Sequence, residues 1–209
     1  MNMTTIKTIE SEIYSTNCYI IEKNNSVILI DFIPEIEEHL TNKKLDKVLL
    51  THIHFDHIAF LNSFQKRFNF ELVLSDFAYK NINNPLYNLF QYISSYMNFE
   101  NVDIDLKNGK VVNDGDIIEW EGNKIRVIST PGHSECSICY FLENENSLFS
   151  GDTLFAGTYG RTDLPSGDDK KIFVSINRLF EILKDDVVVY PGHGEATTIG
   201  REKNNSTFY

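Results

Sequence analysis

Cysteine, tryptophan and proline are scarce in this chain, whose 209 residues include three cysteines, one tryptophan and five prolines. So few cysteines in a chain of this length do not supply a disulfide framework. No apolar run is long enough to cross a membrane, and the first residues lack the basic and then apolar pattern of a secretory leader. We therefore expect a cytoplasmic protein that does not insert into membranes.

Basic residues are also in deficit, because 19 Lys and Arg face 30 Asp and Glu, which gives a net charge of -11 and a pI near 4.9. This balance argues against binding nucleic acid through its phosphates. A hydrophobic fraction of 42% can form a full core, and no Pro- or Ser-rich linker interrupts the chain. We expect one compact domain over residues 1–209, which could be built from two similar halves. Nothing in the composition sets the oligomeric state.

Histidine, in contrast, is concentrated in one short run: three of the six histidines and an aspartate fall within THIHFDH. His52 and His54 alternate, so in an extended segment both imidazoles point to the same side. Asp56 and His57 follow where the chain turns toward the helical pattern of Ala59–Phe68, and that turn could direct them to a second cation. Nitrogen and oxygen ligands suit zinc, iron or manganese, and the lack of a thiolate disfavours a closed structural zinc. The run predicts half of an open, catalytic metal site.

Three more candidate ligands occupy glycine-marked turns, since His133 and His193 each follow Pro-Gly and Asp152 follows a glycine. Short apolar runs of the buried-strand type precede these three turns and also the histidine run. The four runs are Lys47–Leu50, Ile125–Ile128, Ser147–Ser150 and Val187–Tyr190. Loops at strand ends commonly carry the chemistry of an enzyme. Polar turn residues are the ordinary alternative, but only His39, which we expect to be solvated on a short helix, lies away from such a context.

The elements around these turns can also be outlined. Asn17–Ile21 and Ser26–Asp31 read as strands joined by a hairpin turn at Asn24 and Asn25. Asp169–Leu183 reads as a helix. Pro85–Phe99 carries apolar residues at helical spacing, for which a core-facing stripe is the favoured interpretation and an aromatic lid over a substrate pocket is the alternative.

The ligand pattern resembles that of the metallo-β-lactamase superfamily and, within it, the glyoxalase II-like hydrolases. The resemblance covers nearly the whole chain and runs, in the family's order, through His52, His54, Asp56, His57, His133, Asp152 and His193. It implies an α/β fold, the αβ/βα sandwich of two mixed sheets flanked by helices. It also implies two divalent metal ions, with zinc first and iron or manganese as alternatives. By resemblance, one metal would be held by His52, His54 and His133, and the other by Asp56, His57 and His193, with Asp152 bridging.

Two comparisons within the superfamily narrow the expected activity. Lactamases of the commonest type carry Arg where His57 stands and Cys near Asp152, so β-lactam hydrolysis is not expected. The segments 151–165 and 192–202 are similar to short glyoxalase II-like proteins, which lack the helical glutathione-binding domain. Because the chain stops at Tyr209, we expect that domain to be absent here, which leaves glutathione recognition open.

The resemblance implies hydrolysis of a small thioester, such as S-lactoylglutathione, by water that the metals activate, with Asp152 and Asp56 as catalytic residues. No Ser or Cys nucleophile is required. An iron-dependent persulfide dioxygenase shares the ligand pattern and a Gly-Arg-Thr-Asp loop, and a lactonase or other ester hydrolase shares the seven ligands. A metal-stabilised binding module is the non-catalytic alternative.

Several other residues have two interpretations each. Asp31, at the end of a strand, could brace a metal ligand or cap a turn. Arg161 could bind a substrate carboxylate, but an internal ion pair with Asp163 or another acid, which braces the loop, is the favoured interpretation. Tyr159 could face the pocket or pack.

The pair Cys136-x-x-Cys139 resembles a redox or zinc motif but lacks the context that such motifs need. Cys139 falls in a plausible strand, where we expect it to act as a small buried hydrophobic residue. Cys136 could wall the pocket near His133.

Overall fold

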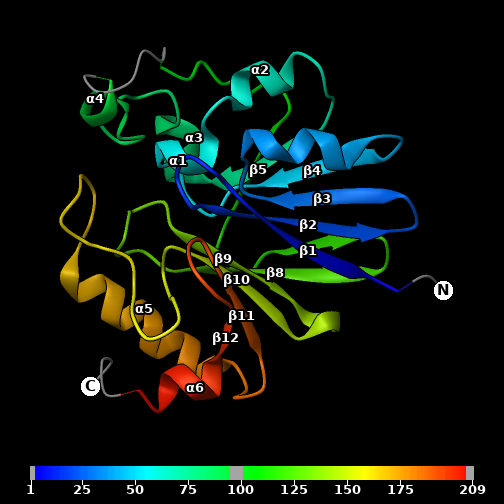
Figure 1. Cartoon of the computed structure of the whole chain (residues 1–209). Helices are drawn as coiled ribbons and strands as arrows, with labels where there is room; N and C mark the ends of the chain where they lie inside the picture. The colour runs from blue at the N-terminus through cyan, green and yellow to red at the C-terminus, as the bar shows by residue number, and fades with distance from the viewer. Residues whose placement is uncertain (1–2, 95–100, 206–209) are drawn as a thin grey trace. The chain divides into compact units, whose positions relative to one another are not determined.

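The chain forms two compact units, Met1–Val111 and Val112–Tyr209, in a computed structural model that describes residues 3–94 and 101–205. Six strands form a mixed sheet in order β1-β2-β3-β4-β5-β6, and six more form a second mixed sheet in order β12-β11-β10-β9-β8-β7. Helices flank both sheets (Figure 1). The expected α/β fold class is confirmed, while the single domain over 1–209 stays a prediction. Among the described residues, no helix combines the length and the apolar character needed to cross a membrane.

The first unit alternates strands with short helices. Its elements are β1 (Thr5–Glu10), β2 (Asn17–Lys23), β3 (Ser26–Ile30), the 3-10 helix η1 (Pro34–Leu40), β4 (Lys44–Leu49), α1 (Phe55–Ile58), α2 (Leu61–Gln65), β5 (Glu71–Ser75), α3 (Asp76–Asn81), α4 (Phe90–Ile93) and β6 (Gly109–Val112). The predicted hairpin is present, and Asn24 and Asn25 take positive φ values of 52° and 66°. Asparagine tolerates this left-handed region, which two-residue hairpin turns require. His39 on η1 is half-buried rather than fully solvated.

The parallel part of the first sheet places the histidine run. Strand β3 pairs with β4 and β4 pairs with β5, both in parallel, whereas β1, β2 and β3 pair antiparallel. Asp31 follows β3 directly, and Thr51 and His52 come just after β4. Because parallel neighbours end at the same edge of a sheet, these residues meet there.

The helix expected over Ala59–Phe68 is wrong in its bounds. The structure begins a helix at Phe55, inside the histidine run, ends it at Ile58, and starts α2 at Leu61. The break falls at Phe60, whose φ is 66°. After the break, the ring of Phe64 packs against that of Phe32 at a centroid distance of 4.6 Å. Local helical spacing alone did not indicate the turn that brings Phe64 onto the core.

The core interpretation of Pro85–Phe99 is also wrong for the part that the structure describes. Residues 95–99 lie outside the described residues. Over 85–94 the helical part is limited to α4, which follows Leu89 at a φ of 66° and buries none of its residues. The one fully buried side chain in this stretch is that of Asn88, which donates to the carbonyl of Ile82 at 2.9 Å.

The second unit contains the remaining elements. They are β7 (Ile117–Trp120), β8 (Asn123–Ser129), β9 (Ile138–Leu142), the 3-10 helix η2 (Glu143–Glu145), β10 (Ser147–Gly151), α5 (Asp169–Ile182), β11 (Val188–Pro191), β12 (Thr197–Thr198) and α6 (Ile199–Lys203). The helix predicted over Asp169–Leu183 is confirmed, and Asp168 caps it by accepting from the backbone N–H groups of Lys170 and Lys171.

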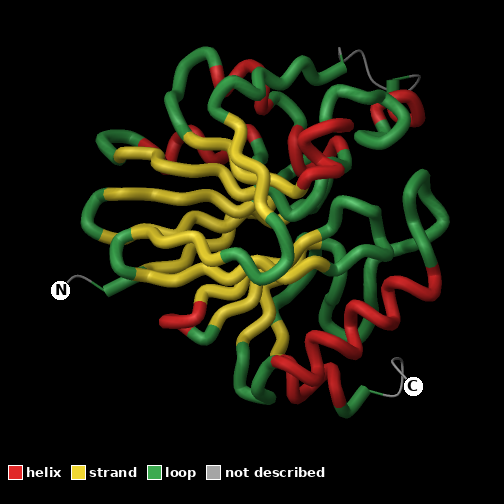
Figure 2. The backbone as a smooth tube through the Cα atoms, turned by 180° about the vertical axis from the view of Figure 1, so that it is seen from behind, coloured by secondary structure: helices red, strands yellow, loops and turns green. Residues whose placement is uncertain are grey.

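Helix α5 covers one face of this second sheet through an apolar stripe at helical spacing. Ile172, Ile176 and Leu179 of α5 join a buried cluster with Ile128 of β8 and Leu148 of β10. Figure 2 shows α5, the long red helix, lying along the strands of its own sheet. Such burial contributes about 1.5–3 kcal/mol for each large apolar side chain, which fixes α5 against the strands that carry candidate ligands.

Strand direction explains why three candidate ligands of the second unit come together. Strands β8, β9 and β10 pair antiparallel in sequence, and β10 pairs with β11 in parallel. Strands β8, β10 and β11 therefore run the same way and end at one edge. His133, Asp152 and His193 each follow one of these three ends.

Candidate metal centre

The first unit gathers three imidazoles at the end of β4. His52, His54 and His57 are buried, with at most 2% of each exposed, and Asp56 is half-buried beside them. The ring of His52 lies 4.7 Å from that of His54 and 4.1 Å from that of His57, measured between centroids. Four of the candidate ligands thus lie close together within this unit, and their role as metal ligands stays a prediction.

Asp31 braces this cluster, which confirms the ligand-bracing interpretation over the cap. Its Oδ1 accepts from the backbone N–H of Thr51 at 2.7 Å, and its Oδ2 accepts from the Thr51 hydroxyl at 2.7 Å. The same Oδ2 lies 2.8 Å from Nδ1 of His57. Asp31 itself is 2% exposed, so all three bonds are shielded from water.

These bonds fix the tautomers of two histidines. A carboxylate only accepts, so Nδ1 of His57 carries the proton and donates to Asp31. The single hydroxyl proton of Thr51 goes to Asp31, and Nδ1 of His52, 3.1 Å from that hydroxyl oxygen, must therefore donate to it. In the neutral form both rings keep Nε2 as a lone-pair donor, which is the state that a metal ligand needs.

Asp56 is positioned by the loop between β1 and β2. The hydroxyl of Thr16 donates to Oδ2 of Asp56 at 3.0 Å, and that Oδ2 also lies 3.4 Å from Nε2 of His57. Tyr14 of the same loop packs edge-on against Phe55. Burial raises the pKa of the Tyr14 phenol, and the negative charge of Asp56 raises it further.

The second unit brings its three predicted ligands to one carboxylate oxygen. Oδ2 of Asp152 lies 3.5 Å from Nε2 of His133 and 3.6 Å from Nε2 of His193. Nδ1 of His133 donates to the carbonyl oxygen of Arg161 at 2.7 Å, which again leaves Nε2 as the lone-pair donor. Asp152 is 8% exposed, whereas the His193 side chain is 30% exposed.

Two glycines make this arrangement sterically feasible. A Cβ on Gly160 would lie 2.0 Å from the backbone oxygen of Asp152 and 2.9 Å from Nδ1 of His133. Gly132 has a φ of 146°, and a Cβ there would lie 2.4 Å from backbone atoms of Ile172. The sequence showed Gly132 in its Pro-Gly-His turn, but nothing in the residue order marked Gly160 as a packing requirement.

The side chain of Arg161 forms an internal ion pair, and the ring of Tyr159 packs against a neighbouring ring. The guanidinium of Arg161 binds both carboxylate oxygens of Asp163, at 2.6 and 2.7 Å, as the favoured interpretation had it. This pair lowers the pKa of Asp163 to about 2. Tyr159 packs edge-on against Phe173 of α5 at a centroid distance of 5.0 Å. The backbone of Arg161 therefore serves His133, while its side chain braces the loop.

The cysteines are buried thiols. Cys139 is fully buried in β9, and burial raises its pKa to about 11. Cys18, Cys136 and Cys139 are thiols, so Cys136 and Cys139 form no disulfide with each other. The prediction that Cys139 is a small buried hydrophobic residue is confirmed, and the high pKa gives the redox interpretation no support.

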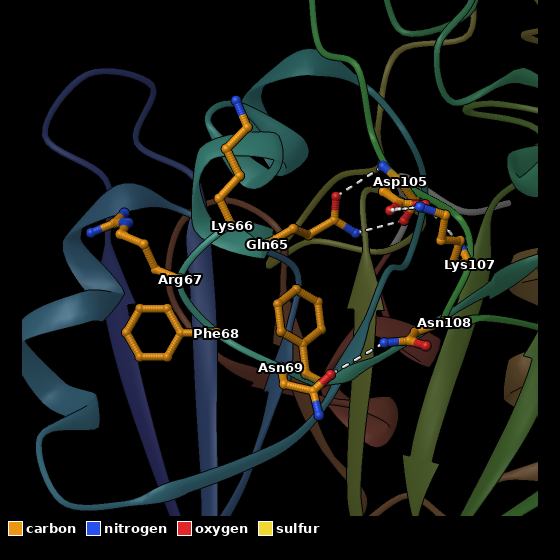
Figure 3. A pocket seen from close by; sticks show the side chains of 9 residues that line it. Gln65, Lys66, Arg67, Phe68, Asn69, Asp105, Lys107 and Asn108 are labelled. Atoms are coloured by element: carbon orange, nitrogen blue, oxygen red, sulfur yellow. Dashed lines mark hydrogen bonds and ion pairs between the residues drawn. The ribbon is translucent and has the colours of Figure 1, made fainter.

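Figure 3 shows a hollow in the first unit that contains none of the predicted ligands. Gln65 and Asp105 close one side through two hydrogen bonds, in which Gln65 Nε2 donates to the Asp105 carbonyl at 2.8 Å and the Asp105 N–H donates to Gln65 Oε1 at 3.0 Å. Arg67 at its rim is paired with Glu37. We find no titratable cluster suited to catalysis among its lining residues.

The donor set fits divalent transition metals. Each unit presents imidazole Nε2 atoms and carboxylate oxygens. Hydrogen bonds at Nδ1 set the ring tautomers of His52, His57 and His133, as is usual for histidines that bind metals. Borderline nitrogen ligands with carboxylates suit zinc, iron and manganese alike, so the donors do not select one metal.

Comparison with known proteins agrees with this chemistry. The model of the metallo-beta-lactamase superfamily matches residues 12–193. The hydroxyacylglutathione hydrolase GloC of Haemophilus influenzae is 32% identical over 203 residues, which are 93% of each chain.

Two solved structures share the fold over nearly the whole chain. The BLEG-1 B3 metallo-beta-lactamase superposes with a TM-score of 0.86 at 28% identity, covering 98% of this chain and 99% of the other. The di-iron-bound form of TTHA1623 has a TM-score of 0.79 at 26% identity, covering 97% and 100%. With the family match over most of its length and its histidine and aspartate groups at the strand ends, this chain belongs to the metallo-β-lactamase superfamily.

Proposed function

We propose that the protein is a metal-dependent hydrolase of small thioesters, with S-lactoylglutathione as the first substrate to test. The observation that carries the proposal lies in the second unit, where His133 and His193 both approach one oxygen of Asp152. A carboxylate oxygen flanked by two imidazoles is suited to bridging two cations. The similarity to GloC supports a thioester among the possible substrates of this superfamily.

The ligand assignment of the proposed centre follows the pattern of the superfamily. His52, His54 and His133 would hold one divalent ion, Asp56, His57 and His193 the other, and Asp152 would bridge them. When bound, such ions lower the pKa of coordinated water from 15.7 toward about 7 and polarise a carbonyl oxygen.

The chain's own residues supply orientation and proton transfer. Asp31 and Thr51 hold His52 and His57 with Nε2 directed away from their hydrogen-bonded Nδ1 atoms. Asp152 would orient the attacking water by accepting a hydrogen bond from it. Asp56, whose Oδ2 is already bound by the Thr16 hydroxyl, would accept the water's proton when it is not itself engaged by a metal. No serine or cysteine nucleophile enters this scheme.

One experiment tests metal content and reaction class together. The purified protein is analysed for zinc, iron and manganese, and is assayed with S-lactoylglutathione, uncharged thioesters, lactones and a β-lactam. We expect thioester hydrolysis that chelation abolishes and zinc restores. The β-lactam belongs in the panel because BLEG-1 is described as a B3 metallo-beta-lactamase. Absence of turnover of every thioester by the metal-loaded protein would contradict the proposal.

An Asp152→Asn variant tests the bridging role. The amide retains the shape but loses the charge, so we expect weaker metal retention and a large loss of activity. A variant that kept both its metals and full activity would remove Asp152 from the mechanism.

An iron-dependent persulfide dioxygenase is the second candidate, and the di-iron-bound form of TTHA1623 supports iron as a metal to test in this fold. The two reactions differ in their demand for oxygen. Oxygen consumption with glutathione persulfide by the iron-loaded protein, without thioester turnover, would select the dioxygenase.

A further inference from the structure

An aromatic cluster lies directly beside a predicted metal ligand in the first unit. Phe55 stands between His54 and Asp56 in the chain, and its ring is 4% exposed. Tyr14 covers it edge-on at a centroid distance of 6.2 Å, with an interplanar angle of 87°. Phe90 of α4 covers it at 5.6 Å and 41°. We call Tyr14, Phe55 and Phe90 the aromatic wall.

Three segments that are far apart in the sequence build this wall. They are the loop between β1 and β2, helix α1 and helix α4; Figure 1 shows the dark blue loop reaching α1. The hydrogen bond from Thr16 to Asp56 fixes the loop at the ligand itself. Tyr14 and Phe90 are only partly buried. Part of each of these two side chains is therefore exposed to solvent.

Two exposed apolar side chains lie on the same segments as the wall. Ile13, next to Tyr14, is 52% exposed, and Tyr92, on the same short helix as Phe90, is 49% exposed. Rigid aromatic side chains bind an apolar group with little loss of conformational entropy. Apolar side chains beside a reactive centre commonly take part in substrate binding.

Basic residues are missing from the segments that carry the wall. Residues 11–16, 51–60 and 85–94 contain no Lys or Arg, whereas Glu12 and Asp56 add negative charge. Carboxylates of a substrate are normally bound by Arg or Lys. In the second unit, the Arg161 guanidinium is already bound by Asp163. The wall is therefore matched to an uncharged group and not to the carboxylates of glutathione.

We propose that the aromatic wall sets the substrate class: the enzyme hydrolyses thioesters that present an uncharged apolar group, in preference to glutathione thioesters. This inference rests on the proposed thioester hydrolysis and narrows it. Tyr14 and Phe90 act as specificity-determining residues that contact the apolar group. They take no part in the proton transfers assigned to Asp56 and Asp152.

The test compares two substrates on the full chain loaded with zinc. One is the phenylacetyl thioester of N-acetylcysteamine, which is uncharged and apolar, and the other is S-lactoylglutathione. The variant is Phe90→Ala. The matched control is Tyr87→Ala, which removes an aromatic ring from the same connecting segment, where Tyr87 contacts Phe77 at 5.2 Å and is not part of the wall.

We expect wild type to have the higher kcat/KM for the uncharged thioester. Phe90→Ala should lower that kcat/KM by about tenfold or more, mainly through KM, because one apolar contact of this size contributes on the order of 10–200-fold to discrimination. It should change kcat/KM for S-lactoylglutathione by less than about threefold. Phe90→Leu should restore most of the loss, and Tyr87→Ala should leave the ratio of the two substrates unchanged.

The failures are distinguishable. If both thioesters are hydrolysed but kcat/KM is higher for S-lactoylglutathione, the proposed role of the aromatic wall is refuted and the proposed hydrolase activity is kept. The same conclusion follows if Phe90→Ala leaves the ratio of the two kcat/KM values at its wild-type value. Hydrolysis of neither thioester overturns both. Binding of an uncharged thioether analogue, S-benzyl-N-acetylcysteamine, measured by calorimetry, gives a readout without turnover, and equal affinity in wild type and Phe90→Ala also overturns the wall.

Discussion

Asp31→Asn is the change that separates the bracing of the metal ligands from the ligands themselves. Asparagine has almost the same shape and tolerates the positive φ of 59° at this position. Its amide oxygen can replace Oδ1 and accept from the Thr51 N–H. Its NH2 group then stands where Oδ2 accepts from both the Thr51 hydroxyl and Nδ1 of His57, so that donors face donors.

The magnitude follows from the bonds that are lost. A hydrogen bond to a charged group contributes about 1.5–3 kcal/mol, so loss of one of the two bonds at Oδ2 lowers the free energy of unfolding by about that amount. His57 can relieve the other conflict only by moving its proton to Nε2, the atom proposed to bind metal. Disruption of such a supporting bond lowers metal affinity by about 10–100-fold.

The assay has two parts. Urea unfolding of the metal-free protein measures the stability change, and competition with a chelator measures zinc affinity. The control is Asp76→Asn, which breaks the exposed pair with Lys80 on α3 and should alter stability by less than about 1 kcal/mol with no change in zinc affinity. The tautomer argument would be refuted by an Asp31→Asn protein that binds zinc as tightly as wild type.

Three further predictions use other parts of the structure. Gly160→Ala should lower the free energy of unfolding by about 1–3 kcal/mol and weaken zinc binding, because the added Cβ has no room. Gly115→Ala, with nothing within 4 Å of the added Cβ, should change stability alone. Unfolding measures stability and chelator competition measures zinc affinity, and equal zinc affinities of the two variants would contradict this prediction. Arg178 lowers the folded-state pKa of Asp114, so Arg178→Met should lower the free energy of unfolding at pH 7 by up to about 1 kcal/mol. This difference between variant and wild type should disappear as the pH falls below that folded-state pKa, and a pH series of urea unfolding midpoints measures it. Cys139, with its pKa of about 11, should resist a disulfide-exchange reagent at pH 8 until the protein is unfolded, and rapid labelling of the native protein at this thiol would disprove its burial.

The sequence alone determined the chemistry of the site. Residue types with metal-binding atoms occur at fixed offsets, and the alternation of His52 with His54 or the Pro-Gly before His133 is visible without coordinates. The strand that ends before each ligand was equally readable, because a short apolar run is a local signal. The hairpin at Asn24 and Asn25 was predictable for the same reason.

Tertiary structure decided everything that depends on which segments meet. Asp31 was undecided between cap and brace until β3 and β4 paired in parallel and placed it against Thr51 and His57. Gly160 had no local signature, because its requirement comes from the backbone of Asp152.

Two predictions were wrong, the helix over Ala59–Phe68 and the core-facing stripe in Pro85–Phe99. Residue spacing indicates which side chains share a face of a helix, but it does not indicate whether another element covers that face. The structure broke the first at Phe60 and left Phe90 only partly buried against Phe55. The candidate ligands are recognised from single residues and their immediate neighbours, so the order of residues was enough to propose them. The bracing of those ligands and the wall beside them are contacts between distant segments, and only the folded chain brings such segments together.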